Sequence, residues 1–589
     1  MALNNELARL FELMADVIEI RGENTFKALA FRKVARVLKD LTVDVAALVE
    51  DGTLGQIAGI GKSSQRIIEQ FVREGRSAEA DDLLGGVPAG LIPLLQVEGM
   101  GPKTIALLWR QKNITSAEQL QRALDDGSLA GIRGIGQKKL ASMKQGLARL
   151  REAGQRRGIG EALPVATALI EAVRGIEGVA RAEVAGSLRR CRETIGDVDL
   201  LCCVKEASAA EAVTAAFVKL PGVQRVLAQG PVKASVVVDG MQVDLRVLPE
   251  EHFGAALMYF TGSKEHNVKV RGLAQKKGMT LNEWGLYNLD EYDKAGKKTG
   301  EAPAARPVAS RTEQEIYAKL EMTYIEPELR EDRGEVEAAL ERRLPKLIRL
   351  EDIRGDLHTH TTASDGHASI EQMAEAAKAL GYAFLAITDH SRSQVIANGL
   401  SPQRLLEHVQ RIRKAADRIK GITLLAGSEV DILSDGSLDY EDAVLAELDI
   451  VIASPHVALK QDTKKATERI VRAINNRYVN VIGHPTGRLI GGRDGLPLDF
   501  APIFKAAAAT GTALEINASY PRLDLNDVHA RAAREAGVKL SINTDAHSVE
   551  DLAQMRFGIG VARRAWVGAE DVINCLTIAG LRKFLCAKR

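Results

Sequence analysis

Seven short apolar runs, separated by segments of helical periodicity, fill residues 351–589 of this 589-residue chain. Because each run has only four or five residues and is followed by a helical pattern, the region predicts strands that alternate with helices. Seven such alternations favour a parallel (β/α)7 barrel, which constrains the fold more than any other feature of the sequence. The predicted strands are 353–357, 383–387, 423–426, 450–453, 479–482, 512–516 and 539–542.

Side chains of the kind that bind metal ions follow every one of these runs. The carboxyl ends of parallel barrel strands meet at one rim, where the catalytic residues of such barrels collect. A single buried histidine is usually an ordinary core residue, but metal-type side chains at seven strand ends predict a metal centre. They are His358, His360, Asp365, Asp389, His390, Glu429, His456, His484, Asn517, Asp545 and His547.

The first 150 residues have helical periodicity and contain one short pattern three times, with two glycines in each copy. One copy is more often a plain helix turn, but three copies with trailing lysines favour binding of phosphate oxygens by backbone N–H groups. The pattern resembles the helix-hairpin-helix motif of DNA-repair proteins, which binds the phosphodiester backbone without reading bases. The resemblance implies DNA contacts at Gly59, Gly61, Lys62, Gly99, Gly101, Lys103, Gly134, Gly136 and Lys138.

Three aspartates in the middle of the chain predict a second metal site. Asp197 and Asp199 alternate along one predicted strand and therefore share a face, and Asp244 lies in a strand that follows the Asp239-Gly240 hairpin signal. Three carboxylates placed in this way suit two Mg²⁺ ions that bind a 3′-hydroxyl and a triphosphate. A bare Asp-x-Asp is often only solvated, but the preceding Gly186-Ser187 turn and two arginines favour a nucleotidyltransferase.

A further segment indicates which family of nucleotidyltransferases the chain resembles. It consists of Tyr259-Phe260-Thr-Gly262-Ser and is followed by Asn267 and Arg271. With it, residues 1–330 resemble the family X DNA polymerases of the polymerase beta type. The resemblance implies that Asp197, Asp199 and Asp244 are catalytic and hold Mg²⁺ or Mn²⁺, with Arg246 beside Asp244. It also implies nucleotide contacts at Ser187, Arg190, Gly196, Tyr259, Phe260, Gly262, Asn267 and Arg271. Without the resemblance, the less favoured alternative is that Tyr259 and Phe260 are plain core aromatics.

Three positions depart from that family's pattern. Lys264 stands where an aspartate near the incoming base is usual, and Ile195 replaces a serine of the phosphate loop. Both changes put nucleotide affinity in question without removing a metal ligand. Ile67 stands where the lyase lysine belongs, so no Schiff base can form there and we expect no lyase activity by that route. Lys62 is a possible substitute, although a phosphate contact suits it better.

The barrel region resembles the PHP domain, named for polymerase and histidinol phosphatase, whose barrel holds three metal ions. The resemblance implies that nine residues are ligands of three Zn²⁺ or Mn²⁺ ions, a choice that their mixed nitrogen and oxygen donors leave open. His367, His408 and His529 match no ligand position and are expected at the surface, while Arg488 suits either a phosphate contact or an exposed salt bridge. The nine are His358, His360, Asp365, His390, Glu429, His456, His484, Asp545 and His547.

The whole chain is therefore similar to bacterial and archaeal family X polymerases with a C-terminal PHP domain. The expected fold class is multidomain, with all-α helix-hairpin-helix domains, an α/β nucleotidyltransferase palm and thumb, and a distorted (β/α)7 barrel. The expected domains are 1–88, the helical DNA-binding domain; 89–150, a second helix-hairpin-helix domain of the fingers type; 151–250, the palm; 251–325, the thumb; 326–350, a linker; and 351–589, the PHP barrel.

The resemblance implies one protein that is both a polymerase filling short gaps during DNA repair and a metal-dependent 3′–5′ exonuclease. Action at abasic sites or on 3′-phosphates is a further activity that the resemblance leaves open. Its partners would be gapped or nicked double-stranded DNA and dNTPs. Two other classes stay open, a small-molecule phosphatase of the histidinol-phosphate type with a vestigial polymerase and a non-catalytic scaffold that binds DNA ends. The three palm aspartates argue against the phosphatase, and the two sets of metal ligands argue against the non-catalytic scaffold.

Composition adds little to this interpretation. Seventy-nine basic against 78 acidic residues give a net charge of +1, so the total charge neither favours nor excludes nucleic acid. Five cysteines without CxxC spacing predict free thiols, and no apolar run reaches the roughly 18 residues of a membrane span. The amino terminus has no signal-peptide pattern. We expect a cytoplasmic, nucleoid-associated monomer without membrane contact.

Overall fold

A computed structural model describes residues 2–22, 25–41, 45–74, 76–91, 94, 97, 100–129, 132, 135, 136, 139, 140, 143, 144, 147, 156–294 and 302–588. The chain divides into two compact units, one with residues 1–155 and 497–501 and one with residues 156–496 and 502–589. Within the ranges just given, no helix combines the length and the apolar content that crossing a bilayer requires.

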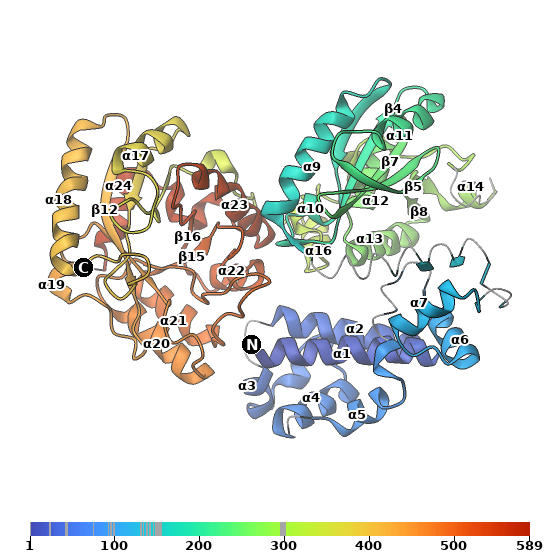
Figure 1. Cartoon of the computed structure of the whole chain (residues 1–589), viewed down its shortest axis with the longest axis horizontal. Helices are drawn as coiled ribbons and strands as arrows, with labels where there is room; N and C mark the ends of the chain where they lie inside the picture. Colours follow the sequence, from blue (N-terminus) through green and yellow to red (C-terminus); the bar gives the residue numbers. More distant parts are fainter. Residues whose placement is uncertain are drawn as a thin grey trace. The chain divides into compact units, whose positions relative to one another are not determined.

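The first unit is built from helices, as the periodicity predicts. Helices α1 and α2 pack along each other (Figure 1), and Phe11 of α1 meets Phe31 of α2 edge to face at 5.4 Å between ring centroids. Their apolar positions recur three or four residues apart, so one face of each helix enters the core. The helices are α1 Ala2–Arg21, α2 Thr25–Asp40, α3 Val45–Glu50, α4 Lys62–Glu74, α5 Ala78–Leu84, α6 Pro102–Lys112 and α7 Ala117–Asp125.

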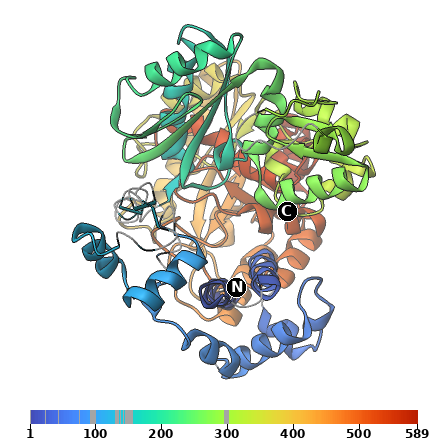
Figure 2. The same ribbon diagram turned by 90° about the vertical axis from the view of Figure 1, so that its right-hand side faces the viewer.

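The palm is a five-stranded sheet in the order β2-β4-β7-β6-β5, whose twist is visible in Figure 2. The central pair β4 and β7 is parallel, and β6 returns to β7 through Asp239 and Gly240, which have φ values of 48° and 72° as a two-residue hairpin requires. The palm elements are β1 Arg157–Gly158, α9 Ile159–Arg174, β2 Val179–Val184, α10 Gly186–Arg189, β3 Thr194–Ile195, β4 Asp197–Val204, α11 Ala210–Phe217, β5 Val223–Gln229, β6 Lys233–Val238 and β7 Met241–Pro249.

The core around which the thumb packs includes residues beyond the predicted end of the thumb, and Trp566 of the barrel region belongs to it. Residues 326–350 are expected to be a linker, yet Arg330 and Glu335 are fully buried there and Val336 joins the thumb core. Arg330 donates to Glu313 at 2.6 Å and His266 pairs with Glu335 at 2.7 Å, so internal ion pairs account for the two buried charges of this segment. The elements are α12 Phe253–Thr261, α13 Lys264–Lys276, β8 Met279–Asn282, β9 Gly285–Asn288, α14 Leu289–Lys294, α15 Glu313–Lys319 and α16 Glu335–Leu340.

The seven predicted strands form one parallel sheet in sequence order, from β10 to β16. A bridge between Thr359 and Ala546, which follow β10 and β16, brings its two edges together. Helices such as α17, α18 and α20 cover the outside (Figure 1). The elements are β10 Gly355–Asp356, α17 Ile370–Ala379, β11 Phe384–Ile387, α18 Pro402–Arg418, β12 Thr423–Asp431, α19 Asp442–Leu445, β13 Ile450–Ser454, α20 Thr463–Asn475, β14 Val481–Ile482, α21 Phe500–Thr510, β15 Ala513–Asn517, α22 Asp527–Glu535, β16 Leu540–Asn543, α23 Met555–Arg564 and α24 Ile578–Cys586.

Candidate active sites

The three palm aspartates lie on the parallel strands β4 and β7. The register pairs Asp199 with Asp244 and Asp197 with Gln242, so all three carboxylates project from one face of the sheet. Gln242 donates to Asp244 at 3.0 Å, and the Lys233 ammonium lies 3.2 Å from the other oxygen of Asp244. A carboxylate triad of this kind offers hard oxygen ligands, which suit Mg²⁺ or Mn²⁺.

The crowding of negative charge raises the pKa of two of these carboxylates. Burial, and then the charges of Asp197 and Asp244, raise the pKa of Asp199 to about 7. Burial and Asp244 likewise raise the pKa of Asp197. Carboxylates that repel each other in this way are stabilised when a cation lies between them. The electrostatics of the palm therefore fit a site for divalent ions.

The turn that precedes these strands is shaped by close contact with Asp199. Gly186 begins α10 with φ of +63°, and a Cβ added there would lie 2.1 Å from Asp199 Oδ2. Ser187 follows in the same short helix, and Gly196 connects β3 to β4 next to the Arg156 guanidinium. Ile195 is fully buried, so an apolar core side chain stands where the family's serine would be.

Arg190 is held by protein groups rather than extended into solvent. Its Nε donates to Glu331 at 3.1 Å and its Nη1 donates to the carbonyl of Thr261, next to Gly262. In the part of the chain that the structure describes, its Nη2 has no protein partner. This third nitrogen therefore remains available as a hydrogen-bond donor.

The aromatic pair predicted to contact the sugar lies at the end of α12. Tyr259 is 38% exposed and packs edge to face on Phe260, which excludes a plain core role for Tyr259. Arg246 lies over the Phe260 ring at 5.2 Å. On α13, Asn267 donates to the Tyr259 carbonyl at 2.7 Å, and Arg271 follows one turn later. Lys264, the first residue of α13, is exposed.

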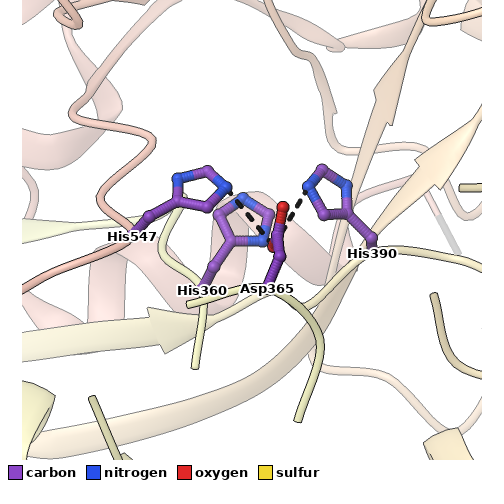
Figure 3. Close-up of side chains that lie close together, drawn as sticks. All are labelled: His360, Asp365, His390 and His547. Carbon is purple, nitrogen blue, oxygen red and sulfur yellow. Dashed lines mark ion pairs between the residues drawn. The ribbon is translucent and has the colours of Figure 1, made fainter. Parts of the chain in front are cut away.

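The nine barrel residues converge at the rim formed by the strand ends. Ligand atoms within 4.8 Å of one another form three overlapping groups, joined by His360, His390 and Glu429. In Figure 3 the Asp365 carboxylate lies between His390 and His547, at 3.6 and 3.4 Å from their Nε2 atoms. The groups are His360, Asp365, His390 and His547; His358, His360, Glu429 and Asp545; and His390, Glu429 and His456. His484 joins them through Glu429 Oε1 at 2.9 Å.

The donor atoms at this rim fit metal ions better than they fit one another. Glu429 lies 2.8 Å from His390 Nδ1 and 2.9 Å from His484 Nε2, yet neither of its oxygens has a partner in hydrogen-bond geometry among the described residues. His358 Nε2 and both ring nitrogens of His484 are also buried without a hydrogen-bond partner among the described residues. Buried polar atoms without hydrogen bonds are costly, so their convergence indicates a site for cations.

The charge of the rim gives the same indication. Burial alone would lower the pKa of His390 and His456, but Glu429 and the aspartates raise these pKa values to about 10 and about 9. Burial would raise the pKa of Glu429, whereas His456, His358 and His390 lower it well below its usual range. The carboxylates therefore create a negative potential that divalent cations can neutralise in place of protons.

Supporting carboxylates behind the ligands were not anticipated from the sequence. Glu515 accepts from His358 Nδ1 at 2.8 Å, and Asp431 accepts from His456 Nδ1 at 2.5 Å. Such partners fix the ring orientation and the tautomer of a ligating histidine. His408 is likewise buried and donates to the Asp389 carboxylate at 2.8 Å.

The expectation that His408 and His529 lie at the surface is therefore wrong, since both are at least 92% buried. His408 is the ion-pair partner of Asp389, and His529 begins a buried face of α22. His367 is exposed, as expected. The sequence around a single histidine gives no signal that distinguishes a buried histidine from an exposed one.

Several of the candidate metal ligands line a cavity of about 320 Å³. Its walls include Asp365, His390 and His547, and one arginine, Arg522. Arg522 Nε lies 3.6 Å from Asp545 Oδ2, and its buried Nη1 has no hydrogen-bond partner in the described structure. Arg488 is neither an exposed salt bridge nor a cavity residue, because it pairs at 2.7 Å with Glu193 of the palm.

The described residues of the three glycine patterns share one backbone hydrogen bond. Ile60, Met100 and Ile135 each donate a backbone N–H to the residue three positions earlier, at 3.1, 2.9 and 3.0 Å. Helix α4 begins at Lys62, just after Gly61, and Gly101 caps α6. The carbonyl of Gly136 accepts the backbone N–H groups of Lys139 and Leu140, at 2.9 and 3.1 Å. Gly59 lies in the first turn, whereas Gly99, Gly134, Lys138 and the Lys103 side chain lie outside the described residues.

The lyase position is part of the same unit. Ile67 lies on α4, is 1% exposed and belongs to the helical core. No amine can therefore act from this position, and the absence of lyase activity by this route stays a prediction.

Comparisons with known proteins agree with this geometry. Family models match at residues 2–77 (helix-hairpin-helix domain), 256–331 (DNA polymerase beta thumb) and 356–519 (PHP domain). The DNA polymerase/3′-5′ exonuclease PolX of Bacillus subtilis (strain 168) is 38% identical over 583 residues, 98% of this chain and 99% of the relative. A probable phosphatase of Thermoanaerobacter sp. (strain X514) is 31% identical over 246 residues, 40% of this chain and 95% of the relative. The chain therefore belongs to the family X DNA polymerases that carry a C-terminal PHP domain.

Proposed function

We propose that this protein fills short gaps in DNA with its palm and trims DNA 3′ ends with its barrel, as a polymerase and a 3′–5′ exonuclease. The observation that carries the proposal is the presence of two separate ligand sets in one chain, the palm carboxylates on β4 and β7 and the ring of histidines and carboxylates on the barrel rim. The full-length similarity to a polymerase/exonuclease supports it.

In the palm, Asp197, Asp199 and Asp244 would hold the ions, and Ser187 and Arg190 would bind the triphosphate. Tyr259 offers an exposed ring face to the sugar of the incoming nucleotide. Asn267 and Arg271 lie on one face of α13 and would contact the new base pair. Both active sites take divalent metal ions, and we propose Mg²⁺ or Mn²⁺ for the palm because its donors are all oxygens.

In the barrel, the nine residues of the rim would hold three Zn²⁺ or Mn²⁺ ions, since their donors mix nitrogen and oxygen. When bound, such ions lower the pKa of a water molecule and offset the charge of a phosphodiester. Glu515 and Asp431 hold the histidine rings in place from behind. Action at abasic sites and on 3′-phosphates stays a prediction.

The substrate we propose is gapped or nicked duplex DNA, bound by a monomer. The three glycine motifs would contact phosphates without reading sequence, through backbone N–H groups and the lysines that follow them. The domain limits at residues 88, 150, 250, 325 and 350 stay predictions.

One gel tests the proposal. A 5′-labelled primer at a one-nucleotide gap is incubated with Mn²⁺, with and without dNTPs, using the wild type, Asp244→Ala and His358→Ala. We expect Asp244→Ala to lose only primer extension and His358→Ala to lose only primer shortening. A primer that never changes length would contradict the proposal and favour a phosphatase of small esters. Binding of DNA ends in a metal-free buffer, with no reaction in any metal, would favour a scaffold.

Arg522 is expected to bind the phosphate of the DNA end in the barrel cavity. Replacing it with glutamine removes a charge-assisted hydrogen bond and should raise the KM for the DNA 3′ end by on the order of tenfold. Arg493→Gln is the matched control, because Arg493 is exposed on a nearby loop and does not line the cavity. Equal KM values for the two variants would exclude this role.

A further inference from the structure

Two neighbouring arginines at the end of α23 connect the barrel to the polymerase part, residues 156–350. Arg563 donates to Glu328 at 2.7 Å and to the carbonyl of Ile348 at 3.0 Å. Arg564 donates through Nη1 to the carbonyl of Arg190 and to Glu331, both at 2.8 Å. Both arginines therefore cross the same interface, but only Arg564 contacts a residue of the nucleotide site.

Glu331 is the acceptor that Arg564 and Arg190 share. Its Oε1 receives Arg190 Nε at 3.1 Å and Arg564 Nη1 at 2.8 Å, and Arg192 lies 3.5 Å from its Oε2. Burial would raise the pKa of Glu331, but Arg564, Arg190 and Arg192 lower it to about 2. Glu331 is thus a buried negative charge whose neutralisation is divided among three arginines.

The other end of Arg564 is fixed within the barrel. Its Nη2 donates to Asp527 Oδ2 at 2.8 Å, and the same oxygen accepts from Arg333 at 2.9 Å. The Arg564 side chain is 4% exposed, so these ion pairs are shielded from water and salt. A continuous row of alternating charges runs from Asp527 through Arg564 and Glu331 to Arg190.

This division of charge determines how strongly Glu331 attracts Arg190. With Arg564 present, Glu331 needs only part of the positive charge of Arg190, and the remaining Nη2 donor is available to a triphosphate. Without Arg564, Glu331 would attract Arg190 more strongly, because opposite charges in a buried site interact strongly. Arg190 would then bind the carboxylate in competition with the nucleotide.

We propose that Arg564 is a positioning residue of the polymerase site, through which the barrel keeps the charge and the orientation of Arg190 available to the incoming nucleotide. The inference rests on the proposed function, since it takes Arg190 to be a triphosphate contact. It assigns the barrel a role in nucleotide addition that is independent of its own metal site.

The test compares Arg564→Met with Arg563→Met in the full-length protein. Gap filling on a one-nucleotide gap gives kcat and KM for the complementary dNTP, and primer shortening without dNTPs reports on the barrel. We expect Arg564→Met to raise the KM for the dNTP by on the order of tenfold, the effect of one buried charge-assisted hydrogen bond, with kcat and primer shortening within about twofold of the wild type. Arg563→Met should leave the KM unchanged although it removes an ion pair at the same interface.

A second substitution separates charge competition from a general loss of packing. Adding Glu331→Gln to Arg564→Met removes the carboxylate that competes for Arg190, so the double variant should regain most of the lost nucleotide affinity. If Arg564→Met does not fold, Arg564→Lys and Arg563→Lys are compared by the same ratio of KM values. Equal KM values within either pair, or no recovery in the double variant, would overturn the inference.

Arg190→Lys distinguishes this failure from a failure of the proposed function. A normal KM for the dNTP in Arg190→Lys would mean that Arg190 does not bind the nucleotide. A raised KM in Arg190→Lys together with a normal KM in Arg564→Met would keep the nucleotide role and overturn the coupling alone.

Discussion

Replacing Glu429 with glutamine is expected to abolish trimming of DNA 3′ ends while nucleotide addition continues. The Glu429 carboxylate lies between His390, His456 and His484, at 2.8, 3.3 and 2.9 Å. It belongs to two of the three ligand groups, so one substitution weakens more than one ion position. Glutamine keeps the size of the side chain but removes its negative charge, and we expect a loss of about 100-fold or more in hydrolysis.

Metal content gives this prediction a readout other than activity. The wild type and the variant are loaded with Mn²⁺ or Zn²⁺, passed over a desalting column and analysed for bound metal. Glu447→Gln is the control, because Glu447 is exposed on the same barrel and is not a candidate ligand. If Glu429→Gln retains as much metal as the control and trims DNA at the same rate, Glu429 is not a ligand.

The barrel was predictable because parallel strands covered on both faces appear as continuous apolar runs. Each of the seven runs overlaps a strand of the sheet, from Gly355–Asp356 to Leu540–Asn543. The convergence of the ligands followed from the same topology, since residues after parallel strands share one rim. His358 and His547 lie 189 positions apart, yet both reach the cluster for this reason.

The supporting residues could not be predicted in this way. Glu515 and Asp431 lie within strands β15 and β12, where the sequence around them gives no spacing that marks them as partners of histidines. Their role depends on which side chain lies opposite them in space. Arg564 is a similar case, because its partners Arg190 and Glu331 are more than 200 positions away.

The number of charged residues in a segment was the least reliable guide to whether that segment is buried. The segment 326–350 has many charged residues and two prolines, a composition typical of a linker. Arg330 is nevertheless fully buried, because Glu313 and the carbonyl of Ile325 accept its hydrogen bonds. A sequence reports how many charges a segment has, whereas burial depends on whether each charge finds a partner.

Replacing Gly186 with alanine is expected to reduce nucleotide addition by about 100-fold, the effect of moving a reacting group by about 1 Å. The backbone at Gly186 has φ of +63°, which a side chain disfavours, and the new methyl group would lie 2.1 Å from Asp199 Oδ2. Either the turn that carries Ser187 or the Asp199 carboxylate must therefore move.

The measurement is single-turnover extension at a one-nucleotide gap with saturating dNTP, since the expected loss is in kcat. Gly175→Ala is the matched control, because Gly175 is a palm glycine with φ of −80° whose added Cβ would be no closer than 3.4 Å to another atom. Primer shortening should be equal in the two variants, as the barrel ligands are untouched. Extension by Gly186→Ala at the rate of the control would mean that Asp199 tolerates displacement, and that the polymerase site is not built on the contact between this turn and β4.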